Sequence, residues 1–364
     1  MQRFRYIDGL RGIAILMVIL HHAHPYFAHI SNYYLPQAFE NIVQNGDKGV
    51  TLFFVLSAFT LCMSLDKKQK TEYQPVRNYF IRRFFRIVPL YYIAVLAFMF
   101  IKYAPVNKSS LIANLLLIHG LNPLWMNSIV PGGWSVGIEV LFYLFFPFLF
   151  LKLHSATVAV NLTLVSMIVA KLITGLMFRH NAVENDATWG VFIYENIISQ
   201  LPVFLTGICL YRLSVASGQK TIIPHTYLFI ALLIIVHLLG GNIFKVHYLF
   251  AIVFALAAFG LSFFPAKIIV NGFTVWIGRL SYSLYLMHLL VANLLVKYSI
   301  TSFTDNATTD ILIRFGLILS VSIAISILTY HFIELPFQRL GVWLIEHREH
   351  RLKQTKLKNY TDQA

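Results

Sequence analysis

Two ionisable residues near the amino terminus have a spacing that suits chemistry inside a membrane. Arg11 and His22 lie eleven residues apart in an apolar stretch, and eleven helical residues make close to three turns and a rise of about 16 Å. Both side chains would therefore share one helix face, with the imidazole deeper in the membrane. A neutral imidazole can take the proton of an attacking hydroxyl. Plainer roles stay open, namely a core histidine bonded to a neighbour and an arginine that snorkels to the interface.

A second candidate is a cluster of arginines at the start of a later apolar run. Arg82, Arg83 and Arg86 fall within YFIRRFFRIVP at 79–89. Arg86 shares a helical face with each of the other two. Three guanidinium groups at the mouth of a span suit a ligand with several phosphates. The alternative is that these residues only mark the cytoplasmic end of a helix and contact lipid headgroups.

Two further segments place polar groups in apolar surroundings. Glu139, in WSVGIEVLFYLFFP at 134–147, is a lone carboxylate that needs a partner. We expect it to orient His22 or to stabilise its charged form, the alternative being a structural ion pair. The segment GRLSYSLYLMH at 278–288 carries groups that could line a polar tunnel or join helices. The candidates for lining a tunnel or an oxyanion site are Ser57, Ser135, Tyr282 and His288. We expect no metal site.

The composition indicates which class of protein must position these groups. Of 364 residues, 58% are hydrophobic and 12% are charged, whereas a soluble domain has about 25% charged residues. So few charges exclude an ordinary soluble enzyme, a disordered chain and a disulfide scaffold, and a protein with several membrane spans remains. The net charge of +14 then reflects cytoplasmic Lys and Arg rather than nucleic-acid binding. Cys62 and Cys209 lie in apolar runs, so we expect buried thiols without a disulfide.

Apolar runs of about 20 residues predict a bundle of about ten transmembrane helices. The runs cover 10–28, 49–65, 87–104, 134–153, 157–178, 191–213, 224–240, 246–264, 280–300 and 310–334. Arg11 interrupts the first run, which we interpret as a retained helix rather than a signal peptide.

The distribution of positive charge predicts the topology. With both termini in the cytoplasm, most Lys and Arg residues fall on the inner side of the membrane. A shorter apolar run at 111–126 is then a re-entrant or interfacial segment on the outer face. The sequence thus predicts a transmembrane domain at 1–336 and a basic cytoplasmic tail at 337–364.

Six motifs occur in one order along the chain. They are YIDGLRG followed by the Arg11 to His22 spacing, FFVLSAF at 53–59, Arg83 and Arg86 before IVP, WSVGIE at 134–139, SYSLYLMH at 281–288 and FIELPF at 332–337. Together they resemble the membrane-bound acyltransferase family 3 of O-acyltransferases, over nearly the whole chain. One departure is Ala58, where the family usually has glycine. A second departure is that many members carry a fused extracytoplasmic hydrolase-like domain. This sequence shows no such segment, and we therefore expect the membrane module alone.

The resemblance implies transfer of an acyl group, usually acetyl, from cytoplasmic acyl-coenzyme A to a glycan hydroxyl. It implies that Arg11 and His22 are essential, with His22 catalytic, and that Arg83 and Arg86 bind the donor. From the residues themselves we add Glu139 as a catalytic candidate and Arg11 and Arg82 as donor-binding candidates. Acetyl-CoA is then a donor substrate and not a permanent cofactor. The other expected partners are a glycan or lipid-linked glycan acceptor and membrane lipids, without nucleic acid. The expected location is the inner membrane of a bacterium.

A second class of function stays open at this point. Buried His and Glu side chains can relay protons, as in a proton-coupled secondary transporter or flippase. However, the sequence shows no pair of corresponding halves with broken helices, and the arginine cluster has no evident transport role. Within the transferase hypothesis, the acceptor, the acyl chain and an acyl-histidine intermediate also stay open.

Overall fold

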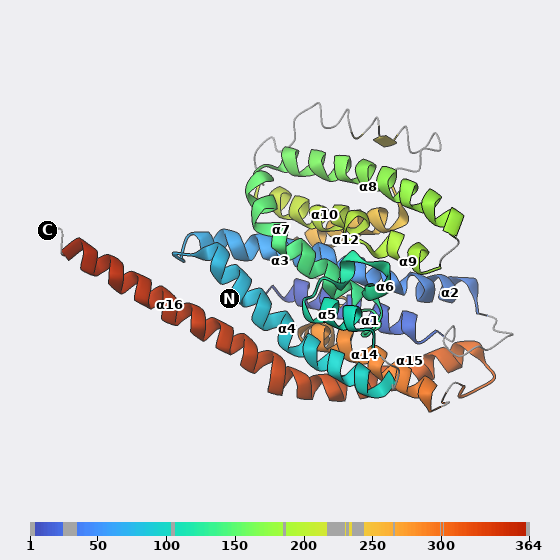
Figure 1. Ribbon diagram of the computed structural model, residues 1–364. Coiled ribbons are helices and arrows are strands. Elements are labelled where there is room, and N and C mark those ends of the chain that lie inside the picture. The colour runs from blue at the N-terminus through green and yellow to red at the C-terminus, as the bar shows by residue number, and fades with distance from the viewer. Residues whose placement is uncertain are drawn as a thin grey trace.

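Helices make up the described part of the computed structural model, as Figure 1 shows. The structure describes residues 4–24, 35–102, 106–184, 187–216, 230, 233–234, 244–264, 266–298, 300 and 302–361. No strand occurs within these ranges, which confirms the predicted all-helical class.

The helices are joined mostly by short connections. In chain order they are α1 (Arg5–His22), α2 (Gln37–Gln44), η2 (Asn45–Lys48), α3 (Gly49–Gln69), α4 (Pro75–Lys102), α5 (Lys108–Leu115), η3 (His119–Leu121), α6 (Pro123–Met126), α7 (Trp134–Lys152), α8 (Ala156–Glu184), α9 (Ala187–Glu195), α10 (Ile197–Val215), α12 (Val246–Phe263), α13 (Gly272–Arg279), α14 (Ser281–Lys297), α15 (Ala307–Thr329), η5 (Tyr330–Glu334) and α16 (Leu335–Thr361).

Seven helical segments of the described chain are long and apolar enough to cross a membrane. They are 37–69, 75–101, 134–152, 156–180, 188–215, 246–263 and 307–355, and the pair α13 and α14, bent by 77°, makes an eighth if it forms one span. The predicted count of ten is not confirmed. One predicted span, 224–240, lies almost entirely outside the described residues. The placement of both termini in the cytoplasm stays a prediction.

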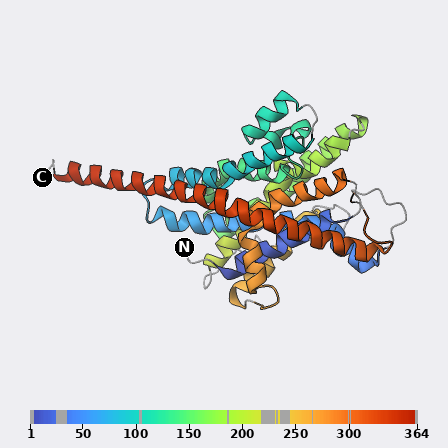
Figure 2. The same cartoon turned by 90° about the horizontal axis from the view of Figure 1, so that it is seen from below.

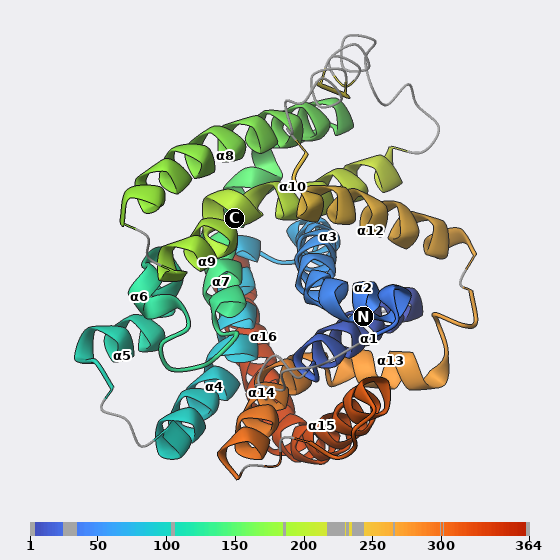
Figure 3. The same ribbon diagram turned by 90° about the vertical axis from the view of Figure 1, so that its right-hand side faces the viewer.

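The first helix is not among these seven segments, although it lies inside the bundle. Its 18 residues include three charged ones, Arg5, Asp8 and Arg11. The helix contacts α3, α12, α13, α14 and α15, and Figure 3 shows it surrounded by neighbours. Asp8 is buried and Arg11 partly buried, so both meet protein, which lowers the cost of placing them within a membrane.

Two glycines allow α1 and α13 to approach each other closely. A Cβ atom on Gly12 would lie 2.0 Å from the carbonyl oxygen of Thr274, and one on Gly278 would lie 1.8 Å from that of Asp8. No larger residue fits at either position without moving a backbone. Small residues at such contacts are typical of packed membrane helices.

The bundle has inner and outer helices. In 37–69 and 188–215, 67% of the apolar window is buried, compared with 28% in α12. The first two segments contain α3 and α10 and form the interior, whereas α12 presents side chains outward. Cys62 on α3 and Cys209 on α10 are buried free thiols, as predicted.

The segment 111–126 forms short helices. α5, η3 and α6 contain eight, three and four residues, well below the roughly 20 residues of a spanning helix. No single helix there crosses a membrane, in agreement with the prediction. Its location on the outer face stays a prediction.

The carboxyl-terminal part is one long helical segment. α15 continues through the π-helical η5 into α16. The predicted tail, 337–364, is therefore helical as far as Thr361. Figures 1 and 2 show α16 extending away from the bundle towards the carboxyl terminus.

Candidate active site

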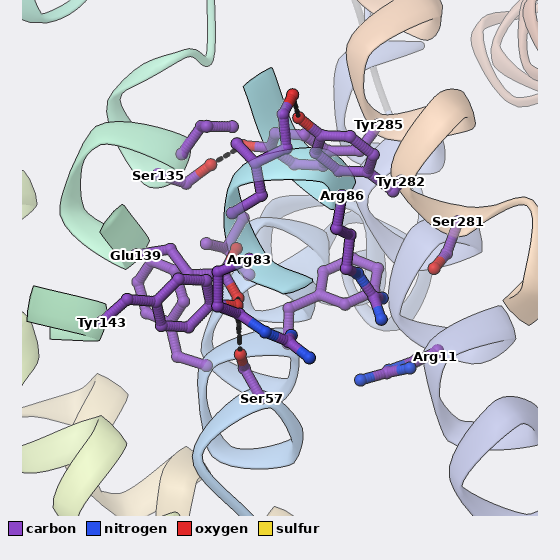
Figure 4. Close-up of a pocket in the computed structure, with 15 residues that line it drawn as sticks. Arg11, Ser57, Arg83, Arg86, Ser135, Glu139, Tyr143, Ser281, Tyr282 and Tyr285 are labelled. Atoms are coloured by element: carbon purple, nitrogen blue, oxygen red, sulfur yellow. Dashed lines mark hydrogen bonds between the residues drawn. The ribbon is translucent and has the colours of Figure 1, made fainter. Parts of the chain in front are cut away.

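A polar cavity lies between α1, α3, α4, α7 and α14 (Figure 4). Its volume of about 70 Å³ is room for several water molecules. Its charged and hydroxyl-bearing lining residues are Arg11, Ser57, Arg83, Arg86, Ser135, Glu139, Tyr143, Ser281, Tyr282 and Tyr285. The fold thus gathers most of the predicted site residues from five helices that are far apart in the sequence.

Three arginines give one part of this cavity an excess of positive charge. Arg11 comes from α1, and Arg83 and Arg86 come from α4. The guanidinium of Arg11 donates to the hydroxyl of Thr60 at 3.3 Å. The guanidinium of Arg83 lies 5.7 Å from the ring centre of Tyr143. Only one carboxylate lines the same cavity, so the cavity suits an anionic ligand.

Arg82 is separated from these three arginines. Its guanidinium donates to both carboxylate oxygens of Glu72, at 2.9 and 3.2 Å. Successive residues on a helix point about 100° apart, so Arg82 and Arg83 lie on opposite flanks of Arg86. The sequence could group the three by type, but the structure pairs Arg82 with a carboxylate outside the cavity.

The carboxylate of Glu72 also binds other groups. Lys68 lies 2.9 Å from it and the amide of Asn78 donates to it at 3.1 Å. Burial would raise the pKa of Glu72, but hydrogen bonds from Arg82, Lys68 and Asn78 outweigh this effect and lower the pKa. Arg82 thus belongs to a structural ion network in the turn between α3 and α4.

Glu139 has different partners from the one the sequence suggested. The hydroxyl of Ser57 donates to its carboxylate at 2.5 Å, and the hydroxyl of Tyr143 donates to the same oxygen. The two hydroxyl oxygens are 2.9 Å apart. His22 does not line this cavity, and the orientation of His22 by Glu139 stays a prediction.

His22 instead lies beside His288. The Nδ1 atom of His22 is 2.8 Å from the carbonyl oxygen of Val18. Nδ1 of His288 is 3.1 Å from that of Leu284. Nε2 of His288 is 3.3 Å from Nδ1 of His22, and the ring centres are 5.0 Å apart. Two predicted candidates, 266 residues apart in the chain, therefore form a pair in which His288 is buried and His22 is partly buried.

Tyr285 connects the cavity to this histidine pair. Its ring centre lies 5.6 Å from that of His288. Its hydroxyl accepts from Ser135 at 2.7 Å and donates to the carbonyl of Gly132 at 3.0 Å. Gly132 has a φ of 70°, a left-handed conformation that favours glycine. Figure 4 shows Ser135 and Tyr285 at the opposite end of the cavity from Arg11.

Tyr282 and Tyr143, the latter not singled out by the sequence, complete the polar lining of the cavity, and Glu334 of the FIELPF motif lies outside that lining. Tyr282 lines the cavity and donates to the carbonyl of Ile87 at 2.8 Å. Tyr143 lies one helical turn after Glu139, a spacing that could have identified it. Glu334, in the π-helical η5, accepts from Ser283 at 2.9 Å. A π-helical turn often marks a functional site, but it is not visible in a sequence.

Metal ligands do not gather in the part of the chain that the structure describes. No group of three or more His, Cys, Asp or Glu side chains there could hold a metal ion. The polar groups of the cavity are arginines, hydroxyls and one carboxylate, which suit binding of an anion and hydrogen bonding.

Comparison with known proteins places these residues in a family context. No solved structure matches the chain. Proteins named "Putative O-acetyltransferase" from Staphylococcus aureus strains COL and MRSA252 are 24% and 23% identical to it, over 95% and 96% of this chain. The chain spans 60% and 59% of their lengths. The acyltransferase family 3 model, described as "Acyltransferase domain", matches residues 4–331. The chain therefore belongs to this family of acyltransferases.

Proposed function

We propose that this chain is an integral-membrane O-acyltransferase that moves an acetyl group from acetyl-CoA to a glycan hydroxyl. One observation carries the proposal: Tyr285 lines a cavity that contains three arginines, and its ring lies beside the histidine pair. The names of the Staphylococcus aureus relatives support O-acetyl transfer.

The arginines fit the anionic end of the donor. Coenzyme A carries its phosphates on the nucleotide and its thioester at the end of a long, narrow arm. Guanidinium groups bind phosphates through charge-assisted hydrogen bonds, so Arg11, Arg83 and Arg86 would hold that end. The arm would then extend through the cavity towards Tyr285. Because the cavity measures only about 70 Å³, we expect its lining side chains to move when the donor enters.

His22 supplies the proton transfer in this proposal. Its basic nitrogen takes the proton of the acceptor hydroxyl while the hydroxyl oxygen attacks the thioester carbonyl. The carbonyl becomes an oxyanion, for which the hydroxyls of Ser135 and Tyr285 are our assigned donors. To donate to it, the two hydroxyls would turn from their present acceptors, Tyr285 and the carbonyl of Gly132. The carbon–sulfur bond then breaks, and the thiolate of coenzyme A receives the proton from His22.

The proposed setting is the inner membrane of a bacterium. Arg83 and Arg86 would open to the cytoplasm, where acyl-CoA is made, together with the basic helix α16. The glycan or lipid-linked glycan would reach His22 from the outer half of the membrane. This arrangement separates the charged donor from its acceptor and lets only the acyl group pass between them.

Acetyl transfer from radiolabelled acetyl-CoA in isolated membranes tests the proposal. We expect the variant His22→Ala to lose about 100-fold or more of the wild-type rate, because it lacks the general base. His154→Ala, which removes an exposed histidine between α7 and α8, is the matched control and should retain the rate. Wild-type activity in His22→Ala would refute the assigned role. Substrate uptake by the wild type without any coenzyme A requirement would instead identify a transporter.

Comparison of surface glycans from cells with and without this chain identifies the acceptor. We expect the loss of one ester-linked acetyl group on a defined sugar. Unchanged ester content on all surface glycans would exclude a surface glycan as the acceptor.

A further inference from the structure

The two histidines of the pair, His22 and His288, are each held by their own helix. Val18 precedes His22 by four residues on α1, and Leu284 precedes His288 by four residues on α14. Each imidazole bonds through Nδ1 to the carbonyl of that earlier residue. α1 and α14 pack directly against each other. The pair is thus built on two rigid helices, which fixes the relative position of the two rings.

The carbonyl partners assign the tautomer of both rings. A carbonyl oxygen can only accept, so Nδ1 of each neutral imidazole carries the hydrogen and Nε2 carries the lone pair. Nε2 of His288 therefore accepts from Nδ1–H of His22, at 3.3 Å. His22 shares this hydrogen between Val18 and His288. Its own basic atom is then Nε2.

We propose that His288 is a positioning residue for His22. This role of His288 rests on the proposed function, and it has two parts. In the ground state, the lone pair of His288 keeps the hydrogen of His22 on Nδ1, so that Nε2 is the base. After Nε2 has taken the acceptor's proton, the same lone pair faces the Nδ1–H of the imidazolium and stabilises its charge. A carboxylate has this place in the Ser-His-Asp triad.

The surroundings of the pair explain why a neutral partner takes this role. Glu139, the carboxylate of the nearby cavity, is bound by Ser57 and Tyr143. The side chain of His288 is fully buried. Among the described residues, the aromatic neighbours of the pair include His21, whose ring centre lies 5.1 Å from that of His22, and Tyr285. A neutral imidazole supplies the hydrogen-bond acceptor without a second buried charge.

Three substitutions of His288 separate positioning from simple packing. In His288→Gln, the amide oxygen reaches the place of Nε2 and can accept from His22. In His288→Asn, the shorter amide cannot reach His22, and His288→Leu has no acceptor. Each variant is assayed in membranes for acetyl transfer, with kcat and the KM for acetyl-CoA measured separately and protein amounts equalised.

We expect His288→Leu and His288→Asn to lower kcat about 10- to 100-fold, with KM within about twofold of wild type, because the donor site is intact. His288→Gln should recover most of the lost kcat. The matched control His247→Leu, which places leucine at another buried histidine on α12, should leave kcat unchanged.

Two results would overturn the role of His288. Equal losses of kcat in the Gln, Asn and Leu variants would show that the residue only packs, and wild-type kcat in all three would show that it does not act on His22. If His288→Leu does not accumulate, the comparison of Gln with Asn decides. Failure of the proposed function is a separate outcome, since the wild type itself would then transfer no acetyl group.

Discussion

Arg82 and Arg83 are neighbours in the sequence but have opposite environments. Arg82 is bound by the carboxylate of Glu72 in the turn between α3 and α4. Arg83 lines the cavity, where its Nε atom has no hydrogen-bond partner among the described residues. Both are arginines, and each shares a helical face with Arg86. The partner of each arginine therefore decides whether it stabilises the fold or can bind a ligand.

The same contrast holds for the two carboxylates involved. Glu72 compensates a positive charge and ties the turn together. Glu139 is bound by two neutral hydroxyls, from Ser57 and Tyr143, and leaves the cavity arginines available. Arg82 thus has a carboxylate partner in the turn, whereas the cavity lining contains three arginines and one carboxylate and suits an anionic ligand.

Removal of a cavity arginine should have the largest effect on donor use. Arg83→Ala and Arg86→Ala each delete a charge-assisted contact to phosphate worth about 1.5–3 kcal/mol, so we expect the KM for acetyl-CoA to rise about 10- to 100-fold. Lys353→Ala, on the exposed face of α16, is the control for a lost positive charge. Equal KM values in all three variants would show that the cavity arginines only set the topology.

Substitution of Glu139 should have a smaller effect than removal of a cavity arginine, and it should change kcat instead of KM. Glu139→Gln keeps an acceptor for Ser57 and Tyr143 but removes the negative charge of the cavity. We expect kcat to fall about tenfold, the effect of losing about 1.4 kcal/mol of stabilisation in the transition state, and KM to change less. A KM change as large as that in Arg83→Ala would place Glu139 in the donor site.

Removal of Arg82 should affect stability and not donor use. Arg82→Ala breaks a partly buried pair with Glu72, so we expect the free energy of unfolding to fall by about 1 kcal/mol. The KM for acetyl-CoA should stay within twofold of wild type. A rise in KM comparable to that of Arg83→Ala would remove the distinction between the two neighbours.

Acid should destabilise the turn between α3 and α4, which contains Glu72. The pKa of Glu72 lies below its ordinary value of 4.5 in the folded chain, so the folded state binds this proton less readily than the unfolded state. The resulting stabilisation is complete above pH 4.5 and is lost as the pH falls through the lowered pKa. Thermal unfolding in detergent between pH 7 and pH 3 measures the loss. Glu72→Gln should show a weaker acid dependence, and an identical pH dependence in both proteins would contradict the assignment.

The smallest expected effect concerns the attachment of α16. Glu349 accepts from the backbone amides of Tyr73 and Gln74, at 2.8 and 3.2 Å, and from the side chain of Asn78 at 2.7 Å. Glu349→Ala should make α16 more accessible to limited proteolysis while the acetyl-transfer rate stays near wild type. Unchanged cleavage would show that the other contacts between α16 and α4 are sufficient.

The sequence could predict several helices closely. The expected spans 49–65 and 134–153 match α3, which ends at Gln69, and α7, which ends at Lys152, because a long apolar run and its polar flanks determine a membrane helix locally. The first helix begins at Arg5 and not at residue 10. Its polar amino-terminal turns are stabilised by contact with α13, and hydropathy alone does not report such a contact.

The individual site residues could be predicted better than their partners. Burial of an ionisable group in an apolar run identified His22, Glu139 and His288 one at a time. The pairing of His22 with His288 and of Glu139 with Ser57 depends on which helices pack together. These contacts join residues 266 and 82 positions apart, and no local pattern determines them.

The most direct test of the account compares two donors, acetyl-CoA and acetyl-pantetheine, which has the same thioester arm without the nucleotide phosphates. The account predicts that wild type and Arg82→Ala strongly prefer acetyl-CoA in kcat/KM, whereas the double variant Arg83→Ala, Arg86→Ala loses most of that preference. Equal use of the two donors by the wild type, or an undiminished preference in the double variant, would contradict the claim that the cavity arginines recognise the anionic end of the donor.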